Sequence, residues 1–370
     1  MKILCVIDSF GSGGAQHQMV SLAIGLKKRG HEVELINYFP KHDFFRGKIE
    51  ESEIPIHDVT KGKGFSLHVL FKLGKLLKRG KYEVALSFLN TPNTYLELSR
   101  FLHRPTRRVV SERSNHVGAR AFSFQRVLHR FASRVVVNSW SHRDWLESRH
   151  PWLNEKLSVI YNGVDTDLFK SSPGVRVAQN ELKLLAIGRV GPEKNPLNLI
   201  KALHLFHGKW GWVPSLTWVG RDDQTREGRK YRKKVEQLLD SMPVIKDKVL
   251  FPGENKAIHT LLAQHDALIH PSFYEGMPNV ICEALCSSRP VLASDVSDNG
   301  RLVAEGERGF LFNPHEPETI VSAMKRLTDL SPEKWERVSA NCRRYGEENL
   351  SVDKLVSQYE SLFQKLCENG

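Results

Sequence analysis

Short apolar runs rich in β-branched residues alternate with longer stretches of helical period along the whole chain. This alternation predicts repeated β-α units around parallel sheets, and therefore an α/β protein. The predicted strands of the first half lie near residues 3–7, 33–36, 84–88, 108–111, 135–138 and 157–161. Those of the second half lie near residues 183–187, 216–219, 249–251, 267–270, 291–293 and 309–312. Two sets of six strands favour two similar doubly wound domains over one large sheet.

A polar segment at 169–181, containing Ser171-Ser172-Pro173-Gly174, separates the two sets of strands and is typical of a linker. The predicted organisation is an N-terminal domain at 1–168, this linker, a second domain at 182–350 and a closing helix at 351–370. The length of 370 residues agrees with two domains, since one core seldom grows past about 300 residues. The closing helix is predicted from apolar side chains at helical spacing, namely Leu355, Tyr359, Leu362 and Leu366.

A glycine-rich loop follows the first predicted strand, with Gly11, Gly13 and Gly14 placed before a helical stretch. Glycines let backbone N–H groups approach a ligand closely, and the N-terminus of the following helix favours a phosphate. The spacing is not a dinucleotide fingerprint, because Gln16 stands where a further glycine is required. A tight turn without a ligand is the alternative interpretation of this loop.

Two cations share the loop after the first strand of the second domain, in the run Gly188-Arg189-Val190-Gly191-Pro192-Glu193-Lys194. Doubly wound sheets bind ligands beyond the carboxyl ends of their strands. A guanidinium fork together with an ammonium point charge suits a diphosphate. Taken alone, Arg189 and Lys194 are equally compatible with ordinary surface residues.

Two carboxylates flank a turn in the run from Ser272 to Leu285, with Glu275 in the loop after a predicted strand and Glu283 inside the next helix. Asn279 or Pro278 is a suitable start for that helix. The helix N-terminus then favours a phosphate, and the carboxylates can accept hydrogen bonds from the vicinal hydroxyls of a ribose or a sugar. A solvated pair of glutamates is the alternative.

These motifs together resemble the retaining family-four glycosyltransferases of the GT-B fold, and the resemblance covers essentially the whole chain. It implies two doubly wound Rossmann-like domains facing an interdomain cleft, the first for the acceptor and the second for a nucleotide sugar. The segments at 86–91 and 110–115 further resemble the branch that builds bacterial surface or lipid-linked glycans. The motifs that carry the resemblance are Gly13-Gly14-Ala15, Tyr161-Asn162-Gly163-Val164-Asp165, Gly188-Arg189 with Lys194, and Glu275 with Glu283.

The resemblance also implies roles for single residues. It assigns Arg189 and Lys194 to the donor diphosphate, Glu283 to the ribose, and Glu275 to the donor sugar. The remaining donor-binding positions that it implies are Gly13, Gly14, Glu254, Gly276, Met277, Pro278, Asn279 and Val280.

On the acceptor side, many relatives carry a histidine close to the position of Arg113, so the resemblance implies that either Arg113 or His116 meets the transferred sugar. Cleavage of the anomeric bond leaves negative charge on the diphosphate, where Arg189 and Lys194 act. In the enzymes that this chain resembles, the acceptor hydroxyl attacks from the face of the leaving group. We therefore expect Glu275, Arg189 and Lys194 to be the catalytic residues, without a protein nucleophile.

Neither a metal site nor a cofactor is predicted. The run Asp165-Thr166-Asp167 spells a metal-binding DxD, but its place in the loop before the linker favours a structural turn. The cysteines form no Cys-x-x-Cys pair and no Cys/His ligand set, which fits a reducing cytosol. The apolar run at the start is too short for a signal peptide or a membrane span, so we expect a cytoplasmic protein.

The net charge of +12 is unevenly distributed. Residues 1–170 carry 27 basic and 16 acidic side chains, or +11, whereas residues 171–370 carry 27 and 26, or +1. No recognition motif for nucleic acid accompanies this charge, so an anionic membrane surface or a lipid diphosphate is the expected partner. One candidate surface is the helix that carries Lys72, Lys75, Lys78, Arg79 and Lys81, and a second is a predicted helical stripe of Arg126, Arg130 and Arg134.

The sequence thus predicts a metal-independent, retaining glycosyltransferase that moves a hexose or an N-acetylhexosamine from a nucleotide sugar, most simply a UDP-sugar. The expected acceptor is a hydroxyl of a lipid-linked or surface glycan, including one carried on a polyprenyl diphosphate, at the inner face of the cytoplasmic membrane. Two alternatives stay open at this point. They are a nucleotide-sugar 2-epimerase and a noncatalytic subunit that binds a sugar nucleotide.

Overall fold

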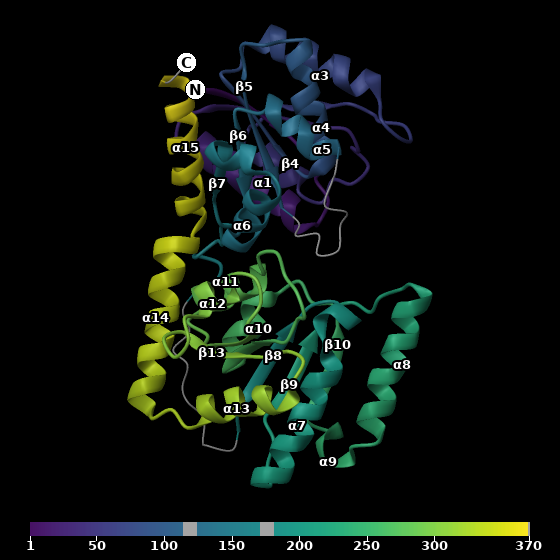
Figure 1. The fold of residues 1–370 in the computed structure, drawn as a ribbon, viewed down its shortest axis with the longest axis vertical. Coiled ribbons are helices and arrows are strands. Elements are labelled where there is room, and N and C mark those ends of the chain that lie inside the picture. The colour runs from purple at the N-terminus through teal and green to yellow at the C-terminus, as the bar shows by residue number, and fades with distance from the viewer. Residues whose placement is uncertain (114–123, 171–180, 369–370) are drawn as a thin grey trace. The chain divides into compact units, whose positions relative to one another are not determined.

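The computed structural model describes residues 1–113, 124–170 and 181–368, and its contacts divide the chain into two compact units (Figure 1). The first unit comprises Met1–Gly163 and Val352–Gly370, and the second comprises Val164–Ser351. The change of unit therefore falls at Gly163, five positions before the end of the predicted N-terminal domain, and the C-terminal segment groups with the first unit. The predicted linker at 169–181 lies mostly outside the described residues.

The sheet of the first unit has seven strands in the order β3-β2-β1-β4-β5-β6-β7, and neighbouring strands pair in parallel. Its strands are β1 (Lys2–Val6), β2 (Glu32–Asn37), β3 (Ile56–Asp58), β4 (Val84–Phe88), β5 (Arg107–Glu112), β6 (Arg134–Val137) and β7 (Leu157–Val159). Its described helices are α1 (Gly14–Lys28), α2 (Arg46–Glu51), α3 (Leu67–Gly80), α4 (Asn90–Leu98), α5 (Phe124–Leu128), α6 (Trp140–Arg149) and α15 (Val352–Glu368). Three short 3₁₀ turns are η1 (Ser99–Phe101), η2 (His129–Phe131) and η3 (Pro151–Lys156).

The C-terminal helix α15 completes the core of the first unit and lies beside α1 (Figure 1). The two helices approach closely, because a Cβ added at Gly25 would lie 2.3 Å from Val356 Cγ2. Tyr359 and Phe363 are fully buried in the same cluster as the strands of the sheet. At the rim, Arg29 forms an ion pair with Glu360 at 2.7 Å. The last helix is therefore a structural part of the first sheet's covering layer.

The sheet of the second unit has six strands in the order β10-β9-β8-β11-β12-β13, again paired in parallel. Its strands are β8 (Lys183–Ile187), β9 (Ser215–Val219), β10 (Val249–Gly253), β11 (Ala267–His270), β12 (Val291–Ser294) and β13 (Gly309–Phe312). Its described helices are α7 (Pro196–Trp210), α8 (Arg226–Asp240), α9 (Pro243–Lys246), α10 (Ile258–Gln264), α11 (Asn279–Cys286), α12 (Asn299–Val303), α13 (Pro317–Thr328) and α14 (Pro332–Leu350).

Both sheets reverse their winding direction at one place, between β1 and β4 in the first unit and between β8 and β11 in the second. At such a switch point the loops that follow the two strands diverge and leave a crevice, where doubly wound sheets bind their ligands. Strand β11 is fully buried along its length, as expected for a central strand covered on both faces. The two switch points are thus the first places to look for a site.

The predicted pair of doubly wound parallel sheets is confirmed. All twelve predicted strands are present, and β3 is an additional strand that the apolar pattern did not reveal. It was missed because Ile56–Asp58 is only three residues long and is partly exposed at the sheet edge. None of the helices in the described parts of the chain combines the length and apolar character that a membrane crossing requires.

Candidate active site

The loops after β8 and β11 meet at the switch point of the second unit, and they contain most of the predicted donor-binding residues. A short 3₁₀ turn, η4 (Pro192–Lys194), forms the first loop and ends at Asn195, which adopts a left-handed conformation with φ 60°. The buried Asn195 amide donates hydrogen bonds to the carbonyl oxygens of Pro271 at 3.1 Å and Pro314 at 2.8 Å. Phe273 N–H donates to the Glu193 carbonyl oxygen at 2.9 Å. These bonds fix one loop against the other.

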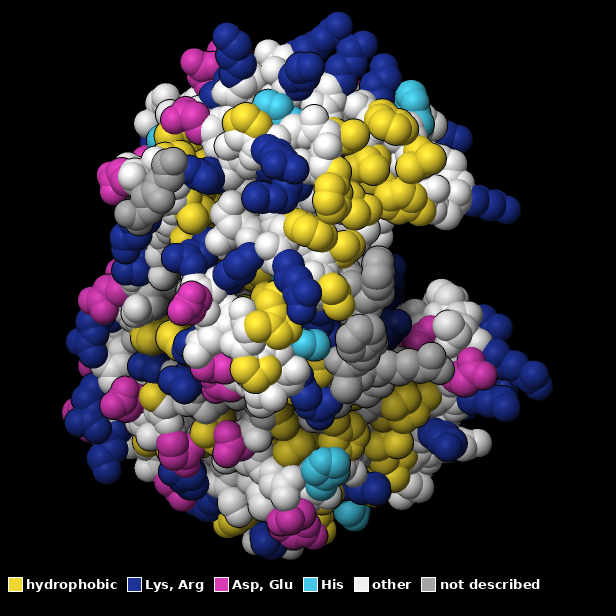
Figure 2. Space-filling model, turned by 45° about the horizontal axis from the view of Figure 1, so that its top comes forward, with side chains coloured by type: hydrophobic (Ala, Val, Ile, Leu, Met, Phe, Trp, Pro, Cys, Tyr) yellow, Lys and Arg dark blue, Asp and Glu magenta, His cyan; other side chains and the backbone are white. Residues whose placement is uncertain are grey.

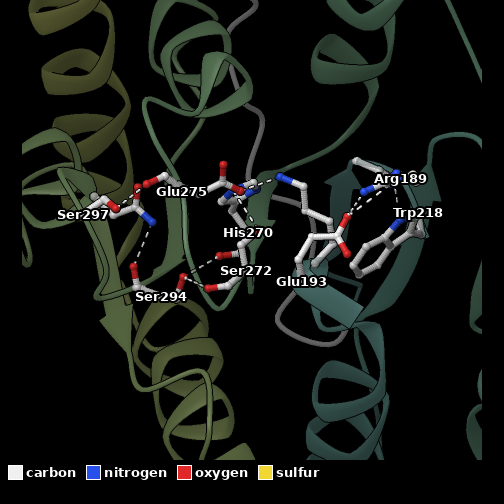
Figure 3. A network of polar contacts seen from close by, with 11 residues as sticks. Arg189, Glu193, Trp218, His270, Ser272, Glu275, Ser294 and Ser297 are labelled. Carbon is white, nitrogen blue, oxygen red and sulfur yellow. Dashed lines mark hydrogen bonds and ion pairs between the residues drawn. The ribbon is translucent and has the colours of Figure 1, made fainter. Parts of the chain in front are cut away.

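The start of the first loop is held against β9. Trp218 Nε1 donates to the Gly188 carbonyl oxygen at 2.9 Å (Figure 3). Gly220 follows β9, and a Cβ added there would lie 2.1 Å from the same carbonyl oxygen. Only glycine lets the backbone approach the loop this closely, so the position of Arg189 depends on Gly220.

Lys194 and Glu275 form the central contact of the site. The Lys194 ammonium lies 2.5 Å from Glu275 Oε1, and His270 Nε2 lies 2.7 Å from the same oxygen (Figure 3). Burial raises the pKa of the Glu275 carboxyl, but the charges and hydrogen bonds of His270 and Lys194 outweigh burial and hold its pKa well below the ordinary value. Glu275 is therefore a carboxylate throughout the neutral range.

Serine side chains support the loop that carries Glu275. Ser297 Oγ donates to the Glu275 carbonyl oxygen at 2.5 Å, and Ser294 Oγ donates to the Ser272 carbonyl oxygen at 2.6 Å (Figure 3). Ser272 Oγ in turn lies 3.2 Å from His270 Nε2. The carboxylate is thus held by its side-chain partners and by its backbone, which reduces the reorganisation that ligand binding requires.

Arg189 lies on the other side of the same loop and is paired with acidic side chains. Its guanidinium lies 2.5 Å from Glu193 Oε1 (Figure 3) and 3.6 Å from Asp223 Oδ2. The hydrogen bond to Glu193 raises the pKa of Arg189. Its side chain is 45% exposed, so it can reach a ligand while remaining near its partners. Asp223 lies in the loop between β9 and α8, where it also accepts a hydrogen bond from Thr225 N–H at 2.9 Å.

Glu283 lies inside α11, which begins after Pro278. Among the described residues, its carboxylate has no hydrogen-bond or ion-pair partner, and burial raises its pKa to about 7. The helix is anchored from behind, since a Cβ at Gly346 of α14 would lie 2.9 Å from Cys286 Cα. A partly buried carboxyl without a charge partner is one that a ligand hydroxyl can satisfy.

The other predicted donor residues occupy three places. Gly276, Met277, Pro278, Asn279 and Val280 run from the Glu275 loop into the first turn of α11. Glu254 follows β10 and is exposed. Gly13 and Gly14 belong to the first unit, where Gly13 precedes α1 and Gly14 is its first residue. The structure thus brings Arg189, Lys194 and Glu275 together on the two loops of the second unit.

Arg113 follows β5 and is held inside the first unit. It donates to Asn162 Oδ1, and its second terminal nitrogen donates to Tyr359 Oη at 3.1 Å. The guanidinium carbon lies 3.8 Å from the centre of the Phe88 ring. Burial lowers the pKa of Arg113. His116, the other predicted acceptor-side residue, lies outside the described residues.

The predicted helical stripe of Arg126, Arg130 and Arg134 is wrong. Helix α5 ends at Leu128, the chain then forms η2, and Arg134 already begins β6. Arg126 is 5% exposed and stacks on the Trp145 ring at 4.6 Å. The spacing of the three arginines suggested one face of a helix, but the helix is too short to continue it.

Sequence reasoning missed a buried charge cluster behind β5. His129 Nδ1 lies 2.5 Å from Glu97 Oε1, and His129 Nε2 lies 2.8 Å from Glu112 Oε1. His142 Nε2 lies 3.0 Å from Glu112 Oε2, and Arg126 Nε lies 3.4 Å from Glu112 Oε1. Burial lowers the pKa of His129, but hydrogen bonds and charge from Glu112 and Glu97 raise it overall to about 9. The residues come from five separate elements, namely α4, β5, α5, η2 and α6, so no local sequence pattern predicts the cluster.

No group of His, Cys, Asp and Glu side chains suited to a metal ion is found among the described residues. Asp165 Oδ1 instead accepts hydrogen bonds from the N–H groups of Asp167 and Leu168, both at 3.1 Å. The run Asp165-Thr166-Asp167 therefore forms a structural turn. Cys282 and Cys286 are buried, and burial raises the pKa of Cys286 to about 12.

Two family models together match nearly the whole chain. Residues 12–168 match the model described as Glycosyltransferase Family 4, and residues 170–346 match the model described as Glycosyl transferases group 1.

Two of the similar proteins are named for lipid-linked acceptors. The chain is 27% identical over 224 residues to a UDP-Gal:α-D-GlcNAc-diphosphoundecaprenol α-1,3-galactosyltransferase of Escherichia coli, a match that covers 58% of this chain and 55% of that protein. It is also 27% identical over 303 residues to an α-1,4-N-acetyl-D-galactosaminyltransferase of Campylobacter jejuni whose named acceptor is a GalNAc-GalNAc-diNAcBac-PP-undecaprenol, with 77% of each chain covered.

Solved structures show the same fold over the full length. The crystal structure of HepE from Anabaena in complex with UDP has a TM-score of 0.81 at 22% identity and covers 99% of this chain and 100% of that one. A glycosyltransferase from Rickettsia africae has a TM-score of 0.83 at 15% identity, with 100% and 99% covered.

Two Rossmann-like sheets, each with its loops at a switch point, and the match to both models define a glycosyltransferase of the GT-B fold. The chain belongs to glycosyltransferase family 4.

Proposed function

We propose that the protein transfers a hexose or an N-acetylhexosamine, with retention, from a UDP-sugar to a hydroxyl of a lipid-linked glycan. The observation that carries this proposal is the meeting of Lys194, Arg189 and Glu275 on the two switch-point loops of the second unit. Two cations and a carboxylate at that place suit a sugar joined to a diphosphate.

Lys194 and Arg189 bind the donor diphosphate in this proposal. Both cations are held by carboxylates, Lys194 by Glu275 and Arg189 by Glu193, so their positions are set before a phosphate binds. An incoming phosphate adds acceptor oxygens on the open side of each cation. Helix α11 adds the positive end of its dipole, because it begins within the same loop. The chain's own cations, without a metal ion, then balance the diphosphate charge.

The two glutamates bind hydroxyl groups in this proposal. Glu275 stays charged because of Lys194 and His270, and it accepts hydrogen bonds from the donor sugar. Glu283 accepts hydrogen bonds from the ribose, which supply the partners that its carboxylate lacks among the described residues.

The reaction breaks the bond between the anomeric carbon and the donor phosphate oxygen. The acceptor oxygen forms the new bond on the same face, and its proton moves to an oxygen of the departing UDP. Negative charge grows on the diphosphate as the bond breaks, so Lys194 and Arg189 stabilise the transition state more than the ground state. No protein side chain has to act as nucleophile.

Support for the donor and the acceptor comes from the similar proteins. HepE has been crystallised with UDP and with UDP-glucose. The relatives in Escherichia coli and Campylobacter jejuni are named for acceptors on diphosphoundecaprenol. These names favour UDP over other nucleotides and a lipid diphosphate as the carrier.

We further propose that α3 rests on an anionic membrane. Leu67 and Phe71, one turn apart on its outer face, are 61% and 57% exposed. The exposed face continues with basic side chains, and the sequence has no acidic residue between Asp58 and Glu83. Exposed apolar side chains beside a basic row are typical of a helix that lies at a lipid interface. Those basic side chains are Lys72, Lys75, Lys78 and Arg79.

Figure 2 shows hydrophobic and basic side chains side by side on the first unit. Co-sedimentation with phosphatidylglycerol vesicles tests this surface. The double variant Leu67→Ser, Phe71→Ser is expected to lose most vesicle binding, whereas Leu250→Ser, on an equally exposed residue of the second unit, is expected to keep it. Equal binding of all three proteins would show that α3 is not the membrane surface.

The donor assignment is tested by thermal shifts with UDP-, GDP- and ADP-sugars. A ligand that binds only the native state raises the melting temperature by mass action. We expect the largest rise with a UDP-sugar and its loss in Lys194→Ala. A noncatalytic binding subunit would show the same shifts but no turnover, and a 2-epimerase would convert the donor without an acceptor.

A further inference from the structure

We propose that the first unit contains a subsite for the acceptor's sugar diphosphate, built between the segment at 61–65 and the start of α4. This inference rests on the proposed function and names where its acceptor binds. A pocket of about 400 Å³ lies at this place. Its lining residues are Lys61, Gly64, Phe65, Asn90, Thr91 and Thr94.

The pocket lies at the switch point of the first sheet. Asn90 begins α4 directly after β4, and β4 is the strand next to β1 where the winding direction reverses. The turn between β4 and α4 is strained at Leu89, which has φ 77° and ψ 157°. Residues other than glycine rarely adopt this backbone conformation. This turn presents Asn90 and Thr91 at the carboxyl edge of the sheet, where doubly wound folds bind their ligands.

Phe65 offers a flat apolar face that is rigidly held. Its ring stacks on the Tyr95 ring with centroids 4.9 Å apart and planes inclined by 20°. Tyr95 is fully buried, and its hydroxyl accepts a hydrogen bond from Ser66 N–H at 2.7 Å. Phe65 is nevertheless 52% exposed. An exposed aromatic ring fixed from behind suits the C–H face of a pyranose, because it needs little ordering when the sugar binds.

Polar groups surround this ring on the side of α4. Asn90 and Thr91 are exposed, and Thr94 is partly exposed. Thr94 Oγ1 donates its proton to the Asn90 carbonyl oxygen at 3.0 Å, so its lone pairs can accept from a sugar hydroxyl. The Asn90 and Thr91 side chains contribute both donors and acceptors. An apolar face bordered by amide and hydroxyl groups is the chemistry that a sugar ring requires.

The hollow next to this pocket is basic. A second hollow of about 450 Å³ shares Lys61 and Gly64 with the first and adds Phe39, Gly62 and Lys63. Lys61 Nζ lies 5.2 Å from the centre of the Phe39 ring, which directs the ammonium toward this hollow. The residues that line the two hollows include no acidic side chain. The second hollow therefore suits the phosphate groups attached to the sugar.

The neighbouring features match the kinds of group in a lipid-linked sugar. The lysines at 61 and 63 and the sugar platform at Phe65 lie just before Leu67 and Phe71 in the chain, the exposed apolar residues of α3. A ligand with a sugar, a diphosphate and a hydrocarbon chain matches all three regions. A free oligosaccharide would leave the lysines and the apolar residues unused.

The test uses two probes that differ only in the diphosphate, namely undecyl N-acetylglucosaminyl diphosphate and undecyl N-acetylglucosaminide. Binding of each probe is measured by saturation-transfer NMR, and UDP binding to the same protein is measured by calorimetry. We expect Phe65→Ala to weaken the binding of both probes at least tenfold, whereas Phe65→Tyr is expected to bind them like the wild type. Phe101→Ala, on an exposed phenylalanine of the same unit, serves as the control.

Lys61→Ala is expected to weaken binding of the diphosphate probe and to leave binding of the neutral glycoside unchanged. Unaltered UDP binding in these variants shows that the donor unit is intact. If the wild-type protein binds UDP and the diphosphate probe but Phe65→Ala and Lys61→Ala bind the probe equally well, the subsite is wrong and the proposed function stands. If the wild-type protein binds no UDP, the proposed function itself fails.

Discussion

The ammonium of Lys194 and the carboxylate of Glu275 lie 2.5 Å apart, although the two residues are 81 positions apart in the sequence. The contact exists because β8 and β11 are neighbours at the switch point of the second sheet, so the loops that follow them lie against each other. It gives the site a positive charge whose position is fixed and a carboxylate that cannot be protonated near neutral pH. A sugar diphosphate needs both at once.

Replacement of Lys194 by alanine is expected to weaken UDP binding about 10- to 100-fold, because a charge-assisted hydrogen bond contributes about 1.5–3 kcal/mol. Calorimetric titration with UDP measures the change. Lys201→Ala, on an exposed lysine of α7, is the matched control and is expected to bind like the wild type. UDP affinity that survives in Lys194→Ala would remove this residue from the donor site.

Glu283→Gln is expected to stabilise the protein in the absence of ligand and to weaken binding of the donor. A glutamate in an unfolded chain titrates near 4.3, whereas burial raises the pKa of Glu283 in the folded protein to about 7. The folded state therefore binds more protons between these values, and rising pH lowers its stability by at most about 4 kcal/mol.

Thermal melts of wild type and Glu283→Gln across pH 4.5 to 8 check this prediction. The variant is expected to melt higher at pH 8, and the difference should shrink as the pH falls from about 7 toward 4.5, because only below about 4.3 is the carboxyl protonated in both states. A constant difference at all pH values would mean that Glu283 is solvated like an ordinary surface glutamate.

Gly220→Ala is expected to impair both folding and donor binding. The added methyl would lie 2.1 Å from the Gly188 carbonyl oxygen, a backbone atom that cannot turn aside. The loop that carries Arg189 must then move, so we expect a lower melting temperature and weaker UDP binding. Gly208→Ala provides the control, because a Cβ there meets no atom within 4 Å. A Gly220→Ala protein that binds UDP like the wild type would show that the loop tolerates displacement.

The buried cluster around His129 predicts a loss of stability at alkaline pH. Glu112 and Glu97 raise the pKa of His129 to about 9, against about 6.5 in an unfolded chain. The stabilisation is thus fully present below about pH 6.5 and is lost as the pH rises through about 9. His129→Gln is expected to cost about 3–5 kcal/mol at neutral pH, because two buried carboxylates lose their partner.

Chemical unfolding of wild type and His129→Gln at pH 6 and pH 10 separates this effect from simple packing. The difference in unfolding free energy between the two proteins should be much smaller at pH 10. An equal difference at both pH values would indicate that His129 acts only through its shape.

Much of the fold follows from local patterns. Strands β4 and β8 begin and end where the apolar runs Val84–Phe88 and Lys183–Ile187 place them, since a central parallel strand is continuously apolar. The short edge strand β3 lacks such a run, and its pairing with β2 becomes visible only in three dimensions. The predicted arginine stripe is wrong because its helical spacing occurs by chance. The helix ends at Leu128, and Arg134 already begins a strand.

The site was partly predictable because its motifs lie in single loops, with Arg189 and Lys194 in one and Glu275 in the other. What the sequence did not reveal is how these residues are paired. The contact of His270 with Glu275 and the burial of Arg113 beside Tyr359 depend on strands and helices that are distant in the chain. Such contacts leave no periodic pattern and no fixed spacing in the sequence, so only the folded structure shows them.

The most direct test of the account is UDP release from a UDP-sugar, measured with and without undecyl N-acetylglucosaminyl diphosphate as acceptor. The account predicts release that requires the acceptor, forms one glycosylated product for each UDP, and is abolished in Glu275→Ala. Release at the same rate without acceptor, or full activity in Glu275→Ala, would contradict it.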